Sequence, residues 1–414
     1  MSNPNKTTYL PGCRVLVPSV VPGLRAEELP GLRALAVEPL AVERLEFLDA
    51  VATAIRKHPR LGREPAAAAV AFWLRRSNLQ TLAREFAARE GQEVRVAAGL
   101  ALHITPANVD TMFLYSWAIS FLAGNANIVR LTTRLSPLML DLLSCLDTVA
   151  TAQPAAWRGN YFVAYEHDAA LSAAFSEYCD QRVVWGGNET VRRLRAVPLN
   201  PHAGERCFAS KRSLALIAVS AYAALDNAAR AKLADRMAVD IAPFGQLACA
   251  SPQVVCWLGE TDVGAEGRAA FAHWLETALA ARQGAPDLGF AVNRLNTGFA
   301  AAAAGQICAM THQPHETDLQ ALSLALAEQE EPCGGGLLMH VACRSVAELA
   351  AALGPAHQTV TYFGFVSEQV RDVARLLGRR GVDRLVPIGQ ALDFTASWDG
   401  FDLWDDFTRQ VTVR

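Results

Sequence analysis

The sequence predicts an α/β fold in which a Rossmann-type parallel sheet domain is followed by a second α/β domain. From residue 93 onward, short runs rich in β-branched residues alternate with helical segments, which is typical of βαβ units on parallel sheets. The length of 414 residues is too great for one core of ordinary size. Apolar residues make up 51% of the chain and charged residues 19%, which favours a packed globular enzyme over a disordered chain.

Residues 1–92 differ in character from the rest. A stretch rich in proline and glycine runs through Gly31, and Ala-rich amphipathic helices are expected over 39–58 and 65–89. We expect this region to be a helical entry segment that packs on the first sheet domain.

The first sheet domain is expected over residues 93–240 and the second over 241–383. In each, strand-like runs precede helical ones, and ligands on such sheets bind at the carboxyl ends of the strands. Residues 384–414 are expected to return to the core. The runs expected to be strands are 94–104, 125–131, 161–166, 181–187, 213–220, 252–258, 335–343 and 357–365.

Charge and cysteine spacing argue against several classes of function. The net charge is -3, from 38 basic and 41 acidic residues, so nothing supplies the electropositive surface that nucleic acid or an anionic membrane requires. The most apolar stretch, 112–123, is too short for a membrane span, and the N-terminus does not follow a secretory signal pattern, which favours a cytoplasmic location. Nine scattered cysteines without a CxxC pair argue against a zinc site or a disulfide scaffold.

The segment Asp240–Gln253, with the sequence DIAPFGQLACASPQ, contains the best candidate nucleophile. Cys249 lies there in a loop bounded by glycine and proline, between an expected helix and an expected strand. An exposed thiolate in such a loop is able to react. The other cysteines lie in periodic apolar segments or lack such a loop.

Three further loops place polar or small residues at strand ends. Asn108 follows an expected strand, where its amide can stabilise an oxyanion, although an asparagine before a helix is more often a turn residue. Arg130 lies near the end of a strand and can hold a ribose or phosphate group, or simply face solvent. Gly186 and Gly187 let a phosphate approach free backbone N–H groups at a helix start, but no GxGxxG fingerprint is present.

Three other segments are weaker candidates. His312, His315 and Glu316 in THQPHETD indicate a metal site, but a polar loop containing proline is more often solvated. Glycines 334–336 predict a flexible turn before a strand, and residues 398–400 predict another turn.

Together, these segments resemble the aldehyde dehydrogenase superfamily, in particular its fatty acyl-CoA reductase branch, the LuxC-like reductases of bacterial bioluminescence systems. The resemblance covers about residues 93–404. It rests on DIAPFGQLACASPQ, VVWGGNETVRRLR, ITPANV, AGNANIVRL, HQTVTYFGF and SWDGFDLW. In that family, a cofactor domain and a catalytic domain are combined, the cysteine forms a thioacyl enzyme, and a nicotinamide cofactor delivers a hydride.

The resemblance implies roles for individual residues. Cys249 matches the nucleophile, and Asn108 matches the asparagine that stabilises the oxyanion together with the backbone N–H of the cysteine. Gln358 stands where related dehydrogenases have a glutamate near the nicotinamide ribose. No metal is implied. The residues implied to bind the cofactor, NADPH or alternatively NADH, are Thr105, Pro106, Arg130, Trp185, Gly186, Gly187 and Gln358.

Two positions depart from the superfamily pattern. Arg130 stands where a lysine is usual, which leaves the choice between NADPH and NADH open. If Lys211 matches the lysine of its motif, Cys207 stands where aldehyde-oxidising relatives have the glutamate that activates water. Without that base, a carrier thiol is favoured over water as the acyl partner, and an acylating reductase is favoured over an aldehyde oxidase.

The function expected from the sequence is NAD(P)H-dependent reduction of an acyl thioester, acyl-CoA or carrier-bound, to an aldehyde through a thioacyl enzyme at Cys249. Expected partners are a carrier protein or acyl-protein synthetase, and further copies of the chain in a homo-oligomer. One alternative is another enzyme of this fold, such as an acyl-phosphate reductase or an aldehyde oxidase. The other is an inactive scaffold that binds a synthetase or carrier.

Overall fold

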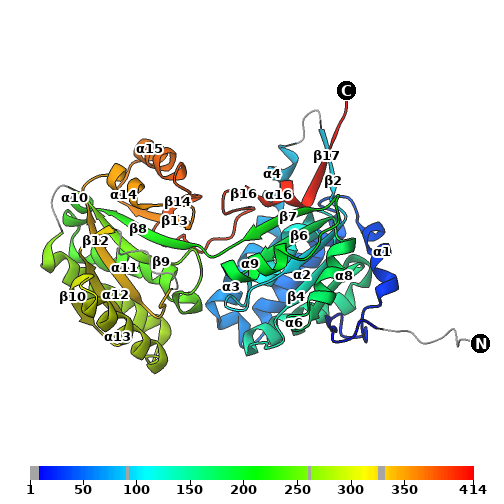
Figure 1. The fold of residues 1–414 in the computed structure, drawn as a ribbon, viewed down its shortest axis with the longest axis horizontal. Coiled ribbons are helices and arrows are strands. Elements are labelled where there is room, and N and C mark those ends of the chain that lie inside the picture. The colour runs from blue at the N-terminus through cyan, green and yellow to red at the C-terminus, as the bar shows by residue number, and fades with distance from the viewer. Residues whose placement is uncertain (1–8, 90–92, 260–262, 325–331) are drawn as a thin grey trace, which may run out of the picture. The chain divides into compact units, whose positions relative to one another are not determined.

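The computed structural model describes residues 9–89, 93–259, 263–324 and 332–414, and the chain forms two compact units (Figure 1). Unit 1 contains the residues up to Ala209 together with Phe394–Arg414, and unit 2 contains Ser210–Asp393. The sequence leads us to expect a boundary near residue 240. The division instead follows Ala209, because strand β8 (Arg212–Ala218) pairs with strands of unit 2.

Unit 1 is built around a six-stranded sheet. Its strands are β1 (Arg14–Val17), β3 (Leu100–Ile104), β4 (Ala126–Leu131), β5 (Asn160–Ala164), β6 (Gln181–Trp185) and β7 (Gly204–Phe208). The strand order is β1-β5-β4-β3-β6-β7, with β1 antiparallel to β5 and the other pairs parallel. The order reverses between β3 and β6, which makes that position the topological switch point where ligands bind on such sheets.

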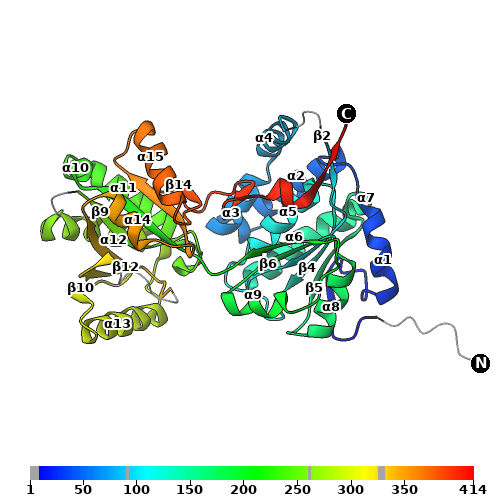
Figure 2. The same cartoon turned by 45° about the horizontal axis from the view of Figure 1, so that its top comes forward.

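Helices cover both faces of this sheet (Figure 2). They are α1 (Leu29–Leu32), α2 (Val42–Lys57), α3 (Pro65–Trp73), α4 (Arg76–Ala87), α5 (Met112–Leu122), α6 (Pro137–Ala152), α7 (Pro154–Trp157), α8 (Ala169–Tyr178) and α9 (Asn188–Arg195). Phe175 of α8 and Leu102 of β3 belong to one apolar cluster on the first face. On the opposite face, Trp117 of α5 packs edge-on against Phe162 of β5.

The C-terminal residues belong to unit 1. Strand β17 (Thr408–Thr412) pairs antiparallel with β2 (Glu93–Ala97) in a separate two-stranded sheet. The run 94–104, expected as one strand, divides into β2 and β3 at Gly99. There φ is +131°, and a Cβ would lie 2.1 Å from Oδ2 of Asp180. The other C-terminal elements are β15 (Ser397–Trp398), β16 (Phe401–Asp402) and α16 (Leu403–Phe407).

Unit 2 contains a seven-stranded sheet. Besides β8, its strands are β9 (Pro252–Leu258), β10 (Ile307–His312), β11 (Thr317–Ala321), β12 (Leu337–Cys343), β13 (His357–Phe363) and β14 (Arg384–Pro387). The order is β10-β11-β12-β9-β8-β13-β14, and every pair is parallel except β10 with β11. The amino ends of β8, β9 and β13 therefore lie at one edge of this sheet.

Helices also cover both faces of the unit 2 sheet. They are α10 (Val219–Ala223), α11 (Asn227–Ile241), α12 (Gly264–Gln283), α13 (Leu288–Ala303), α14 (Val346–Ala352) and α15 (Ser367–Gly378). Met237 of α11 and Leu275 of α12 belong to one apolar cluster, and Leu349 of α14 and Leu377 of α15 belong to another. Across the described ranges of both units, no helix is long and apolar enough to cross a membrane.

Candidate active site

Cys249 lies in the loop that joins α11 to β9, at the amino edge of the unit 2 sheet. Near the start of this loop, three successive residues lie in the left-handed region: Phe244 at φ +54°, Gly245 at φ +58° and Gln246 at φ +65°. For residues with a Cβ, this conformation costs about 1–3 kcal/mol and persists only where the surroundings enforce it. Cys249 itself is half-buried.

The buried side chain of Gln246 holds this turn in place. Its Nε2 donates to the carbonyl oxygens of Pro252 at 2.8 Å and Leu337 at 3.0 Å, and its Oε1 accepts from the backbone N–H of Gly336 at 2.8 Å. The backbone carbonyl oxygen of Gln246 accepts from Nε2 of Gln253 at 2.8 Å. Because both ends of the Gln246 amide are bonded, the turn is fixed to β9 and to the start of β12.

Three consecutive glycines pack against the same turn. Gly334, Gly335 and Gly336 have φ values of +69°, +65° and +90°. A Cβ on Gly335 would lie 2.5 Å from Cβ and Cγ of Phe290, and the N–H of Gly335 donates to the carbonyl oxygen of Gly245 at 2.8 Å. The flexible turn expected here is instead a packed support for the nucleophile loop, and only glycine fits it.

Hydrogen bonds also connect Cys249 to the neighbouring strands. Oγ of Ser213 on β8 donates to the carbonyl oxygen of Cys249 at 2.7 Å and accepts from the N–H of Thr359 on β13 at 3.1 Å. Gln358, also on β13, is only 2% exposed, and its carbonyl oxygen accepts from the N–H of Asp383 at 2.9 Å. Cys249 and Gln358 thus lie at the same edge of unit 2.

Five of the residues predicted for the site lie at the carboxyl edge of the unit 1 sheet. Thr105, Pro106 and Asn108 follow β3, while Gly186 and Gly187 follow β6. Because β3 and β6 are hydrogen-bonded neighbours, their two loops flank the switch point of the sheet. Asn108 is exposed there.

Arg130, near the end of β4, is tied to the same edge. Its carbonyl oxygen accepts from the N–H and Oγ1 of Thr105, at 3.1 Å and 2.9 Å. Its Nη2 donates to the carbonyl oxygen of Tyr165 at 2.9 Å. Burial, and to a smaller extent the charge of Arg193 on α9, lowers the pKa of Arg130, against the opposing influence of Tyr165 and Glu166. Arg193 was not identified from the sequence as a site residue, because it lies on α9, whose side chains are mostly polar.

Trp185 ends β6 inside a buried polar network. Its ring stacks on Phe208 with centroids 3.8 Å apart, and its Nε1 donates to Oγ of Ser116 at 2.9 Å. Ser116 Oγ lies 2.7 Å from Nδ1 of His103, whose Nε2 lies 3.0 Å from Oδ1 of Asn127. Burial lowers the pKa of His103 to about 4, so this histidine is a neutral core residue. The indole of Trp185 is likewise fixed in the core.

Cys207 lies on β7, and its side chain packs against an apolar cluster of unit 1. Burial, followed by the charge of Glu205, raises the pKa of its thiol. Glu205 itself pairs with Arg182 at 2.6 Å and Arg195 at 3.5 Å. The carboxylate of Glu205 is therefore paired with two guanidinium groups. A carboxylate held in this way is poorly suited to act as a base toward water.

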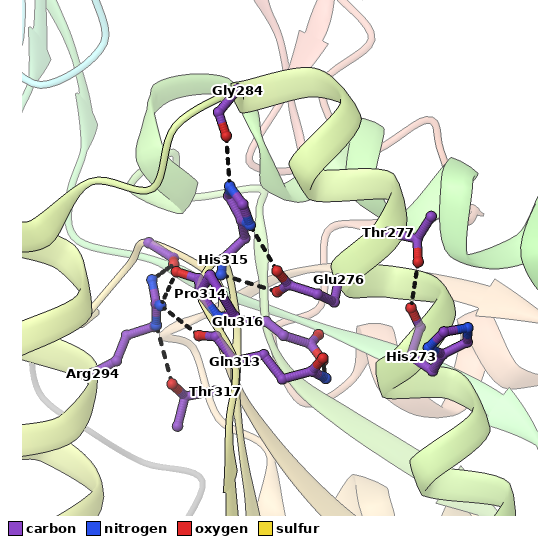
Figure 3. A network of polar contacts seen from close by, with 11 residues as sticks. His273, Glu276, Thr277, Gly284, Arg294, Gln313, Pro314, His315, Glu316 and Thr317 are labelled. Carbon is purple, nitrogen blue, oxygen red and sulfur yellow. Dashed lines mark hydrogen bonds and ion pairs between the residues drawn. The ribbon is translucent and has the colours of Figure 1, made fainter.

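The histidine-containing loop expected to be solvated is partly buried instead. His315 is 7% exposed and Glu316 is 1% exposed, and Figure 3 shows both in a polar network. Nδ1 of His315 lies 2.7 Å from Oε1 of Glu276. Within the described residues, no group of three His, Cys, Asp or Glu side chains is arranged to hold a metal ion.

The candidates thus form two sets, one in each unit. Cys249 and Gln358 belong to unit 2, and the other predicted site residues belong to unit 1. Sequence reasoning missed Ser213, Gln246 and Gly335. These residues support the Cys249 loop through hydrogen bonds between segments far apart in the chain, and no local sequence motif predicts such bonds.

Comparison with known proteins gives one family match and many structural ones. A family model described as acyl-CoA reductase (LuxC) matches residues 77–410. No curated protein matches the sequence significantly. Aldehyde dehydrogenase 21 from Physcomitrella patens, solved with succinate, is similar with a TM-score of 0.67 at 11% identity, covering 94% of this chain and 89% of that one.

Two further solved structures give the same picture. Lactaldehyde dehydrogenase from Escherichia coli is similar with a TM-score of 0.64 at 13% identity, covering 94% of this chain and 88% of that one. An indole-3-acetaldehyde dehydrogenase solved with NAD+ is similar with a TM-score of 0.66 at 15% identity, with the same coverage of 94% and 88%. At these identities the likeness shows the fold. Because the family model spans most of the sequence, this chain belongs to the acyl-CoA reductase (LuxC) family and has the aldehyde dehydrogenase fold.

Proposed function

We propose that this chain reduces an acyl thioester to an aldehyde with NAD(P)H, and that Cys249 carries the acyl group. The observation that carries the proposal is the loop of Cys249. A left-handed turn over Phe244, Gly245 and Gln246, bonded through the Gln246 amide, precedes a half-buried thiol at a sheet edge. Strained backbone that its surroundings enforce is typical of functional sites. The family match supports a thioester of coenzyme A as the donor.

Acyl transfer begins at the sulfur of Cys249. Its thiolate attacks the carbonyl carbon of the donor thioester, a new C–S bond forms, and the C–S bond to the carrier breaks. The carrier leaves as a thiolate and takes up a proton. Since one thioester replaces another, the exchange needs little driving force. The bond from Ser213 to the Cys249 carbonyl oxygen holds the backbone of the nucleophile during this exchange.

Negative charge develops on the acyl oxygen in each step. We assign its stabilisation to the side-chain amide of Asn108 and to the backbone N–H of Cys249, in the manner of an oxyanion hole. Asn108 is exposed in the loop after β3, at the carboxyl edge of unit 1.

The switch point of unit 1 suits a dinucleotide. Gly186 and Gly187 directly precede α9, and a Cβ on Gly186 would lie 3.0 Å from Cγ2 of Thr190, which is closer than usual packing allows. The N-terminus of α9 favours a phosphate, and Arg130 adds a positive charge at a nearby strand end. When bound, the nicotinamide cofactor would supply the hydride that brings the acyl carbon to the aldehyde level. The thiolate of Cys249 then leaves, and the aldehyde is released.

Reduction is favoured over hydrolysis by the residue that replaces the water-activating glutamate of aldehyde-oxidising relatives. If Lys211 matches the lysine of its motif, Cys207 stands at the position of that glutamate, and the nearby Glu205 is paired with Arg182 and Arg195. Without a general base, water attacks a thioacyl enzyme poorly. We propose acyl-CoA or an acyl carrier thioester as the donor and a homo-oligomer as the working form.

Mass spectrometry of the intact protein, mixed with acyl-CoA thioesters of different chain length, tests the proposal. We expect a mass gain equal to one acyl group, located on Cys249 by peptide mapping. Addition of NADPH or NADH is expected to remove it with release of the aldehyde. The Cys308→Ala variant is a matched control, because Cys308 is exposed and has no part in the mechanism, and it should form the same adduct. An adduct on a different cysteine would overturn the assignment, and loss of the adduct as free acid without reductant would overturn the reductase.

The preferred cofactor is expected to be NADPH, with Arg130 contributing to binding of its additional phosphate. A charge-assisted hydrogen bond contributes about 1.5–3 kcal/mol. The Arg130→Gln variant is therefore expected to raise KM for NADPH by about 10-fold or more and to leave KM for NADH nearly unchanged. Steady-state kinetics with both cofactors measures this. Arg158→Gln, at an exposed arginine before β5, should change neither value, and an equal rise for both cofactors with Arg130→Gln would contradict the assignment.

A further inference from the structure

Arg294 on α13 is a buried guanidinium that joins three segments of unit 2 (Figure 3). The side chain is 2% exposed. Its Nη1 donates to the carbonyl oxygen of Gly335 at 2.5 Å, and its Nε donates to Oγ1 of Thr317 at 3.1 Å. Its Nη2 donates to the carbonyl oxygens of Gln313 at 3.1 Å and Pro314 at 2.7 Å. All four acceptors are neutral oxygens, and two of them lie in the turn between β10 and β11.

One of these acceptors connects Arg294 to the nucleophile loop. The carbonyl oxygen of Gly335 accepts the hydrogen bond from Arg294, and the N–H of Gly335 donates to the carbonyl oxygen of Gly245 at 2.8 Å. The same helix also contacts the loop through Phe290. A Cβ on Gly245 would lie 2.5 Å from Cζ of Phe290, and one on Gly335 would lie 2.5 Å from Cβ of Phe290. Helix α13 therefore touches the support of Cys249 at two points.

Acidic side chains lie near Arg294 and near the turn that it contacts. In the turn after β10, Nδ1 of His315 lies 2.7 Å from Oε1 of Glu276, and the backbone N–H of His315 donates to Oε2 of Glu276 at 2.9 Å. These contacts anchor the turn to α12. Burial lowers the pKa of Arg294, while charges including those of Glu276 and Glu316 raise it. Burial, followed by the charges of Asp318 and Glu276, raises the pKa of Glu316 well above its usual range. A buried guanidinium among such groups keeps its place only with its donors bonded.

We propose that Arg294 is a positioning residue for Cys249, acting through Gly335 and Gly245 on the turn that presents the thiol. The proposal rests on the function assigned above, since it concerns the acyl-transfer step at that thiol. The bonds point in three directions from one planar group. A lysine has a single ammonium and cannot reproduce them, although it keeps the charge. The geometry of the guanidinium, more than its charge, is therefore what the loop requires.

The Arg294→Lys variant of the full chain tests this. Misplacement of a reacting group by about 1 Å can cost about 100-fold in rate. We expect the rate of acyl-adduct formation on Cys249, and kcat, to fall by about that factor, while KM for NADPH stays unchanged. Alkylation of Cys249 by iodoacetamide, which needs no such alignment, should continue at a similar rate.

Arg44→Lys is the matched control. Arg44 is also 2% exposed, and its Nη1 donates to the carbonyl oxygens of Phe121 at 2.6 Å and Asn125 at 2.8 Å, within unit 1. We expect it to lower the melting temperature about as much as Arg294→Lys does, with acyl transfer unchanged. If Arg294→Lys does not fold, Thr317→Val, which removes one acceptor and keeps the arginine, is expected to slow acyl transfer by a smaller factor.

Three outcomes would overturn these statements, and they are distinct. Acyl transfer at the normal rate in Arg294→Lys would remove the positioning role and leave the proposed function standing. Equal slowing in Arg44→Lys would show a general effect of stability and overturn the positioning role as well. Absence of any adduct in the unsubstituted protein would overturn the proposed function and this inference with it.

Discussion

The Cys249→Ala variant is expected to lose acyl-CoA reduction by about 10⁴-fold or more, because no thioacyl enzyme forms without the nucleophile. Steady-state oxidation of NADPH in the presence of acyl-CoA measures the loss. The melting temperature should stay close to that of the unsubstituted protein, since Cys249 is half-buried in a loop whose support comes from other side chains. Loss of activity therefore reports on chemistry and not on folding.

Cys249→Ser sharpens this test. The serine keeps nearly the same size, but its hydroxyl is a weak nucleophile unless a neighbouring base activates it. We expect it to be about as inactive as Cys249→Ala. Substantial activity in Cys249→Ala would show that hydride reaches a noncovalently bound thioester directly, which would remove the covalent step from the mechanism. The Cys207→Ala variant, at a partly buried cysteine of unit 1, should still form the acyl adduct on Cys249.

The second large effect is expected for Asn108→Ala. Removal of one oxyanion donor typically costs about 100-fold to 1000-fold in kcat. We expect a loss of that size, with KM for NADPH and the melting temperature little changed because Asn108 is exposed in its loop. Single-turnover measurements on the acylated protein separate the two chemical steps, and both should slow, since each passes through an oxyanion.

A second loop asparagine of unit 1 provides the control for this variant. Asn200 lies between α9 and β7, where its Nδ2 donates to the carbonyl oxygen of Glu177 at 3.0 Å. Asn200→Ala should leave kcat unchanged. If Asn108→Ala raised KM for the cofactor and left kcat intact, Asn108 would be a binding residue, and the oxyanion would need another donor.

Much of the fold was predictable because buried parallel strands are continuous apolar runs. The expected runs 181–187, 252–258 and 357–365 contain β6, β9 and β13, and the α/β class with two sheets is confirmed. An apolar run does not show which of the two sheets the strand will join. Strand β8 is apolar enough for either, and its pairing with β9 and β13 is a contact between distant segments.

Local polarity led to a wrong prediction of solvent exposure in the loop that contains His315. The loop THQPHETD reads as solvated because it is rich in polar residues, yet His315 and Glu316 are buried. Their burial depends on Glu276 and Arg294, which lie on helices some distance away in the chain. The turn expected at residues 398–400 was simpler, since an Asp-Gly pair adopts positive φ readily. The structure confirms it, with φ of +49° at Asp399.

The candidate site divides in the same way. Cys249 stood out because a cysteine between glycine and proline, outside any apolar run, is locally unusual. Gln246 and Ser213 did not, because a glutamine or serine is common everywhere and gains meaning only through its bonds to Leu337 and Thr359. Trp185 was expected to contact the cofactor, and the structure places its indole in the core at the end of β6, where Nε1 donates to Oγ of Ser116.

The discontinuity of unit 1 has a consequence for how the protein is made. Its last elements close over earlier ones: β17 pairs with β2, and Nδ2 of Asn125 donates to the carbonyl oxygen of Phe407 at 2.9 Å. During synthesis, every residue of unit 2 leaves the ribosome before these contacts can form. Domains generally fold as units. The nascent chain can therefore fold unit 2, including the loop of Cys249, before β17 is available to complete unit 1.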